Sequence, residues 1–297
     1  MESSSGLPAH DPTHMRGVLQ QYLQPVDGGT SYRVRECHVA NTRRRDGSRG
    51  TVEYNLCLED PATGQLWDQK VTGISYGGER TRRVWESMQR ALTPQSPAPA
   101  EMLPPFAYVP ELDLLLQVFP HDHRLPALAR LLAGPSPELW SSLLVELGVG
   151  DWTLRDWHAE VVQYRVDMRA ILRLSVRASA SADGAIAERV FYAKIYRDPG
   201  QGQRAFHAQR DLHERAIIAD GPLRVARPIV YLAGWRTLVT ASAPGVSLSR
   251  IIRRGDDVAP AVRSAAAAIA AFHQLDAAAA SGSAPEDIAR LREAESF

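Results

Sequence analysis

Cysteine is scarce in this chain of 297 residues, and so is an excess of either charge. The only cysteines are Cys37 and Cys57, too few for a disulfide scaffold or a cysteine-rich zinc site, so we expect a reducing, cytoplasmic location. The 34 Lys and Arg residues balance 34 Asp and Glu residues, which argues against a general nucleic-acid or membrane-surface binder. No run reaches the roughly 18–20 apolar residues of a membrane-spanning helix, and the N-terminus lacks the pattern of a signal peptide.

What is present is the composition of a globular protein. Apolar residues make up 44% of the chain and charged residues 23%, so a core can be buried and about two domains are expected. Periodicity predicts an α+β organisation. We expect four parts: a loose polar tail over residues 1–14, a first α+β repeat over 15–134, a second over 135–243, and a helical region over 244–297.

The two α+β segments follow the same order: a strand hairpin, a helix, then two further strands. Residues match at an offset of 120 in the hairpins and 123 in the later strands. The matched pairs are Val52 with Leu172, Tyr54 with Leu174, Leu56 with Val176, Tyr76 with Tyr196, Tyr108 with Tyr231, and Leu115 with Leu238. We interpret this as an internal repeat; the alternative is a chance likeness between two α+β segments.

Lysine is the rarest charged residue, since 32 of the 34 basic residues are arginine. Lys70 has polar neighbours and is predicted to lie at the surface. Lys194 lies in an apolar strand, where alternation places it on one face with Tyr192 and Tyr196. A lysine on an inner sheet face needs an anion, and a nucleotide phosphate is the usual one beside a strand and helix. The other interpretation is a lysine on the solvent face of the hairpin.

Three segments together carry a resemblance to a known family. They are FYAKIYRD at residues 191–198, LVTASAPGVSL at 238–248, and IAAFHQLD at 269–276. In this order and spacing they resemble the aminoglycoside phosphotransferase and choline kinase superfamily of small-molecule kinases, over roughly residues 155–280. The resemblance implies a protein-kinase-like N-lobe, here duplicated, followed by the beginning of a helical C-lobe.

The same resemblance assigns roles to residues of this chain. Lys194 would contact the α and β phosphates of ATP, and Ser242 and Ala243 would bind the adenine at the strand end that joins the two lobes. The helix acid that orients the lysine in the family would be Glu214 or Asp211. The phosphate-covering turn would be residues 179–184, although that stretch holds a single glycine.

The chain also departs from the family. It contains no His-Gly-Asp string; the nearest are Pro-His-Asp-His at 120–123 and Arg-Gly-Asp at 254–256. We therefore predict no catalytic residue and no magnesium ligand in this chain. We expect it to be the nucleotide-binding portion of an ATP- and Mg-dependent phosphotransferase, truncated before its catalytic loop and inactive alone. Its acceptor would be an unidentified small hydroxylated molecule. In the first repeat Ile74 replaces the lysine, so that copy would not bind nucleotide. The alternative is a non-catalytic, pseudokinase-like module that binds a ligand or partner.

Overall fold

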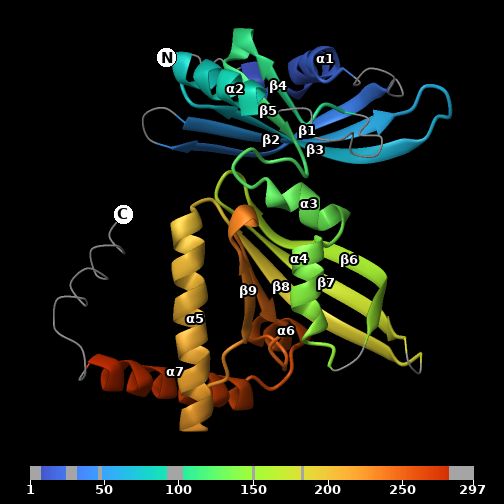
Figure 1. The fold of residues 1–297 in the computed structure, drawn as a ribbon. Helices are drawn as coiled ribbons and strands as arrows, with labels where there is room; N and C mark the ends of the chain where they lie inside the picture. Colours follow the sequence, from blue (N-terminus) through green and yellow to red (C-terminus); the bar gives the residue numbers. More distant parts are fainter. Residues whose placement is uncertain are drawn as a thin grey trace. The chain divides into compact units, whose positions relative to one another are not determined.

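The computed structural model describes residues 8–24, 32–45, 49–91, 103–148, 151–181 and 184–280. These residues form an α+β fold with two five-stranded antiparallel sheets and seven α-helices (Figure 1). The chain divides into two compact units. Unit 1 comprises Met1–Ala133 and Tyr164–Arg169, and unit 2 comprises Gly134–Gln163 and Ala170–Phe297. A six-residue segment thus belongs to unit 1 although it lies far along the sequence.

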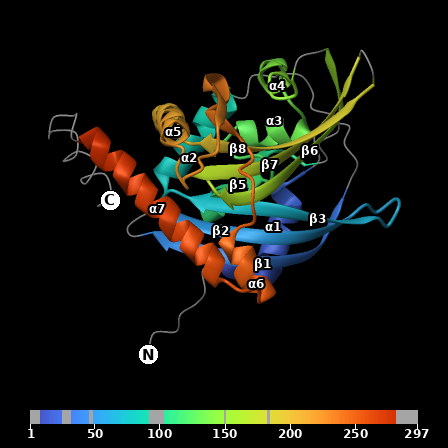
Figure 2. The ribbon, with the colours of Figure 1, turned by 90° about the horizontal axis from the view of Figure 1, so that it is seen from below.

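The first sheet has the strand order β1-β2-β3-β5-β4, and Figure 2 shows β1, β2, β3 and β5 side by side. Its elements are α1 (Pro12–Tyr22), β1 (Arg33–Arg45), β2 (Arg49–Glu59), β3 (Leu66–Ser75), α2 (Glu79–Ala91), β4 (Phe106–Val109), β5 (Leu114–Val118) and α3 (Ala127–Ala133).

The second sheet has the matching order β6-β7-β8-β10-β9. The strands of this sheet and the helices around them in the sequence are α4 (Pro137–Leu144), β6 (Trp152–Arg165), β7 (Arg169–Ala180), β8 (Ile186–Tyr196), α5 (Pro199–Ala219), β9 (Pro228–Leu232), β10 (Thr237–Ala241), α6 (Leu248–Arg254) and α7 (Ala259–Ala280). The helical pattern at residues 285–294 lies outside the described residues.

The prediction of a loose tail over residues 1–14 is wrong for residues 8–14. Residues Pro8–His10 form a 3-10 turn, and α1 already begins at Pro12. The Asp11 side chain accepts a hydrogen bond from the Thr13 N–H at 2.9 Å, so an Asp N-cap and a Pro in the first turn start the helix. The Tyr54 hydroxyl donates to the Ala9 carbonyl at 2.7 Å, which ties this segment to the sheet.

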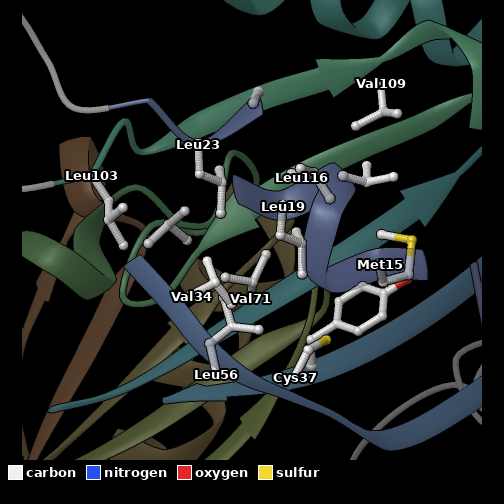
Figure 3. Close-up of a cluster of buried hydrophobic side chains, with 14 of the residues drawn as sticks. Met15, Leu19, Leu23, Val34, Cys37, Leu56, Val71, Leu103, Val109 and Leu116 are labelled. Carbon is white, nitrogen blue, oxygen red and sulfur yellow. The ribbon is translucent and has the colours of Figure 1, made fainter. Parts of the chain in front are cut away.

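Helix α1 forms the core of unit 1 with one face of the first sheet. Met15, Leu19 and Leu23 are fully buried and lie against Val34, Leu56, Val71 and Leu116 in Figure 3. Burying each such side chain stabilises the fold by about 1.5–3 kcal/mol. The opposite face of the sheet carries a separate buried cluster that includes Ile74, Leu115 and Met88 of α2.

The two sheets agree in register as well as in strand order. In each, one row of paired residues crosses the third, fifth and fourth strands. These matched rows are Ile74–Leu115–Tyr108 in the first sheet and Lys194–Leu238–Tyr231 in the second. The row residues differ in number by 120 on the third strand and by 123 on the other two, which are the offsets that the sequence predicted for the repeat.

Two further features recur around the matched rows. Each row ends in a tyrosine stacked on an aromatic residue of the preceding helix: Tyr108 on Trp85 of α2, at 6.4 Å between centroids, and Tyr231 on Phe206 of α5, at 6.5 Å. A 3-10 turn separates β4 from β5, and the same kind of turn separates β9 from β10. A left-handed residue with φ of 48° closes each turn, which folds the strand back into a hairpin.

The helices at the end of unit 2 expose much of their apolar surface. Val262, Ile269 and Phe272 of α7 are 50%, 58% and 39% exposed. None of the helices within the described residues is long and apolar enough to cross a membrane.

Candidate functional site

Lys194 lies on β8, between β7 and β10 of the second sheet. Its strand neighbours Phe191, Ala193 and Ile195 are buried on one face, while Lys194 and Tyr192 are half-buried on the other. The alternation predicted from the sequence is therefore present. Lys70, on β3, is exposed, as predicted.

Helix α5 covers the sheet face that carries Lys194. Paired residues in an antiparallel sheet point to the same side, so Lys194, Leu238 and Tyr231 share a face. On that face Tyr231 meets α5 so closely that a Cβ at Gly202 would lie 2.7 Å from its ring. The Tyr231 hydroxyl donates to the Pro199 carbonyl at 2.7 Å. Lys194 is thus on the helix side of the sheet, which Figure 1 shows with α5 alongside β8 and β9.

The Lys194 ammonium contacts an aromatic ring rather than an acid. Its Nζ lies 4.7 Å from the centroid of the Tyr196 ring, and no ion pair joins it to a carboxylate among the residues that the structure describes. Glu214, the predicted orienting acid, is exposed on α5 and makes no ion pair with Lys194. The other candidate, Asp211, pairs with Arg215. An exposed acid on a helix gains more from water or from a neighbouring arginine than from a lysine on the sheet, so neither prediction of a Lys194 partner holds in this structure.

The predicted adenine-binding residues follow β10 directly. Ser242 and Ala243 are exposed, and the Ser242 N–H donates to the Val190 carbonyl at 3.2 Å. This N–H continues the β8–β10 ladder, so it is already paired within the sheet. Ser242 lies four positions after Leu238, the partner of Lys194, which is about 13 Å along a strand.

The predicted phosphate-covering turn is described only in part. Residues 182–183 lie outside the described residues, and Gly184 has a φ of 70°. Ser179 is buried and its hydroxyl accepts a hydrogen bond from Arg155 Nε at 2.6 Å. This hydroxyl is therefore already hydrogen-bonded to another side chain of the sheet.

Unit 1 holds a cluster of buried polar side chains that the sequence did not predict. The carboxylate of Asp167, on the segment Tyr164–Arg169, is completely buried. Five side chains from four other parts of unit 1 surround it: Arg49 Nη2 at 2.8 Å, Gln117 Nε2 at 3.3 Å, His123 Nδ1 at 3.3 Å, Arg124 Nε at 3.6 Å, and the Tyr76 hydroxyl. We call these residues the Asp167 cluster. Burial and the Asp167 charge raise the pKa of Tyr76, which keeps that hydroxyl protonated and able to donate.

Asp122 fixes the segment that carries Asp167. One of its oxygens accepts the N–H groups of Arg124 and Leu125 at 2.8 and 3.2 Å. The other accepts the Tyr164 hydroxyl at 3.0 Å and the Asp167 N–H at 2.8 Å. Burial, and then the charge of Asp167, raise the pKa of Asp122 to about 6.

Asp122, His123 and Asp167 place potential metal-ligand atoms within 4.8 Å of one another. The surrounding donors do not fit a metal ion, however. Asp122 already accepts four hydrogen bonds, and the guanidinium groups of Arg49 and Arg124 approach Asp167. A divalent cation would have to displace these donors and lie beside two positive charges. We interpret the triad as part of a buried network of ion pairs and hydrogen bonds, not as a metal centre.

The sequence contained one sign of this cluster. The Pro-His-Asp-His string at residues 120–123 was singled out as the nearest match to His-Gly-Asp, and it supplies both Asp122 and His123. Nothing in the sequence links it to Asp167, because that contact joins residues 45 positions apart.

The resemblance to ATP-dependent kinases implies that the chain binds ATP and magnesium. The residues around Lys194 fit a phosphate group but not a magnesium ion. A phosphate fits, because the ammonium has no acid partner among the described residues. Magnesium does not fit, since the carboxylate of Asp198, which follows β8, instead accepts the Gly200 and Gln201 N–H groups as the N-cap of α5.

Comparison with known proteins gives no match: no protein-family model, curated protein or solved structure is significantly similar to this chain.

Proposed function

We propose that unit 2 is the nucleotide-binding portion of an ATP-dependent small-molecule phosphotransferase of the aminoglycoside phosphotransferase type. One observation carries the proposal: Lys194 lies half-buried on the helix-covered face of its sheet, with no carboxylate partner among the described residues. Taking an ammonium partly out of water costs free energy unless an anion compensates for it. A phosphate group is the anion that a lysine on such a strand binds in nucleotide-dependent enzymes.

The position of the predicted adenine site agrees with this function. Ser242 and Ala243 directly follow β10, the strand on which Leu238 pairs with Lys194, and both are exposed. A nucleotide would bind with its base at this strand end and its phosphates at Lys194.

The test is ATP binding by the whole chain, measured by isothermal titration calorimetry. Lys194→Met should weaken binding at least about tenfold, because a hydrogen bond to a charged group is lost. Lys70→Met is the matched control, since Lys70 is the only other lysine and is exposed; its affinity should stay within about twofold. Equal affinities for the wild type and Lys194→Met would contradict the proposal.

ATP consumption distinguishes this function from the alternative of a non-catalytic binding module. Because the Lys194 face offers no magnesium-binding carboxylate among the described residues, the proposal concerns binding, and we expect no turnover with amino-sugar, choline or sugar acceptors. Magnesium-dependent turnover that Lys194→Met abolishes would show that the chain is a complete enzyme, and Asp256 would be the first carboxylate to test.

A further inference from the structure

Tyr76 and Tyr196 occupy the same place in the two repeats. Each lies two residues after the third-strand member of its matched row, Ile74 or Lys194, and each is buried, at 5% exposure. Tyr76 belongs to the buried cluster of Ile74 on the α2 side of the first sheet. Tyr196 lies on the Lys194 side of the second sheet, because its ring contacts the Lys194 ammonium.

In unit 1 this tyrosine belongs to an anion site. The ring of Tyr76 lies beneath two cations, Arg49 and Arg124, whose guanidinium carbons are 5.4 and 5.9 Å from its centroid. Its hydroxyl donates a hydrogen bond to the Asp167 carboxylate. A cation against the ring and an anion on the hydroxyl therefore occur together, and the anion is supplied by the protein itself.

In unit 2 the cation is present and the anion is not. Lys194 lies over the Tyr196 ring as Arg49 and Arg124 lie over Tyr76, at the shorter distance of 4.7 Å. Within the described residues, the Tyr196 hydroxyl makes no hydrogen bond to a carboxylate and Lys194 makes no ion pair. Gln117, which also donates to Asp167, has Thr240 as its match in the second sheet. A cation against the tyrosine ring thus recurs in unit 2, and no carboxylate from the part of unit 2 that the structure describes takes the place of Asp167.

We propose that Lys194 and Tyr196 bind one phosphate group of the ligand together, the Tyr196 hydroxyl donating a hydrogen bond where Tyr76 donates to Asp167. This inference rests on the proposed function, to which it adds a second phosphate-binding residue. Lysine is a point charge without directional preference, whereas a tyrosine hydroxyl donates along one direction. Lys194 accordingly attracts the phosphate and Tyr196 positions it.

The experiment uses the whole chain and two probes, inorganic tripolyphosphate and ATP. Tyr196→Phe removes only the hydroxyl and should weaken tripolyphosphate binding roughly tenfold. Tyr192→Phe is the matched control, since Tyr192 lies two residues away on the same face and has no counterpart in the Asp167 cluster; its affinity should change less than twofold. In the double variant Lys194→Met/Tyr196→Phe the two losses should not add, because both residues act on one phosphate.

The outcomes separate this inference from the proposed function. Unchanged tripolyphosphate affinity in Tyr196→Phe, with a clear loss in Lys194→Met, overturns the role of Tyr196 and leaves the role of Lys194 intact. Loss in both variants for tripolyphosphate, with ATP binding no tighter than tripolyphosphate, supports the phosphate site and contradicts the nucleotide. Additive losses in the double variant would mean two separate anion sites and would also overturn the inference. Acetate in place of tripolyphosphate tests whether a carboxylate suffices, and binding of equal strength would contradict a phosphate ligand.

A measurement on the wild type keeps the inference testable should Tyr196→Phe not fold. With tyrosine labelled by 13C at Cζ, the resonance of Tyr196 should shift as tripolyphosphate saturates the chain, and that of Tyr76 should not, because Asp167 already occupies its hydroxyl. A Tyr196 resonance that stays in place at saturation would overturn the inference.

Discussion

The two units place different residues at one position of the same sheet. Ile74 and Lys194 occupy equivalent places in the matched rows, each paired with a leucine that is itself paired with a tyrosine. Ile74 is fully buried beside Met88 of α2, whereas Lys194 is half-buried and lies against the Tyr196 ring. The fold therefore accepts either an apolar side chain or a cation here. What differs is whether the third-strand residue of the row adds an apolar side chain to the core or carries a half-buried cation.

The reciprocal exchange tests this comparison most severely. Ile74→Lys places an ammonium in an apolar cluster without an anion, and it should cost unit 1 roughly 4 to 7 kcal/mol, the equivalent of a 3–5 unit pKa depression for a buried lysine. Lys194→Ile should leave the stability of unit 2 within about 1 kcal/mol and abolish ATP binding. Urea unfolding with calorimetric titration measures both. Comparable stability losses in the two variants would mean that Lys194, like Ile74, contributes mainly to the stability of its unit, and would contradict the difference drawn between them.

Removing the internal anion of unit 1 is expected to have the next largest effect. Asp167→Ala leaves Arg49 and Arg124 without their buried carboxylate, so unit 1 should lose about 3–5 kcal/mol of unfolding free energy. Asp68→Ala, at an exposed aspartate on β3 of the same unit, should change it by less than about 0.5 kcal/mol. Urea unfolding of the two variants provides the comparison. A small loss for Asp167→Ala would show that the Asp167 cluster does not hold its segment in unit 1.

The contact of α5 with the second sheet can be disturbed by one methyl group. A Cβ at position 202 would lie 2.7 Å from the Tyr231 ring, so Gly202→Ala should destabilise unit 2 by about 1–3 kcal/mol. Gly234→Ala, where a Cβ would meet nothing within 4 Å, is its control. Thermal unfolding measures the difference. If Gly202→Ala proved as stable as its control, α5 would not be held against Tyr231 as described.

The smallest expected effect is a pH dependence confined to unit 1. The pKa of Asp122 is raised to about 6 by burial and by Asp167, so the native state holds this proton more tightly than the unfolded chain does. The contribution of Asp122 to stability is therefore greatest below about pH 4 and is lost as the pH rises to about 6. Relative to the wild type, Asp122→Asn should gain at most about 2 kcal/mol between these two values. Urea unfolding at pH 4 and pH 6.5 gives this difference, and a constant gap between the two proteins would exclude the raised pKa.

Local pattern was sufficient to predict the elements around Lys194. Alternation along residues 190–197 gave its face, and the offsets of 120 and 123 gave its partner in the first sheet, because burial on one face of a strand imposes a period of two on the sequence. The turn between β4 and β5 was not predictable from this alternation, since it depends on a left-handed backbone at Asp113. The polar composition of residues 1–14 indicates a tail, whereas Asp11 and Pro12 within it form a standard helix N-terminus at which α1 begins.

The sequence by itself determined the two α+β repeats, the faces of their strands and the place of Lys194 in an apolar strand. Each of these follows from local order along the chain. Only the tertiary structure decided which charges meet. The Arg49–Asp167 and Tyr76–Asp167 contacts join residues 118 and 91 positions apart, and the acids expected beside Lys194 instead pair locally or face solvent. An ion pair depends on a few ångströms of separation and on burial, and neither is encoded in the spacing of residues along a strand or helix.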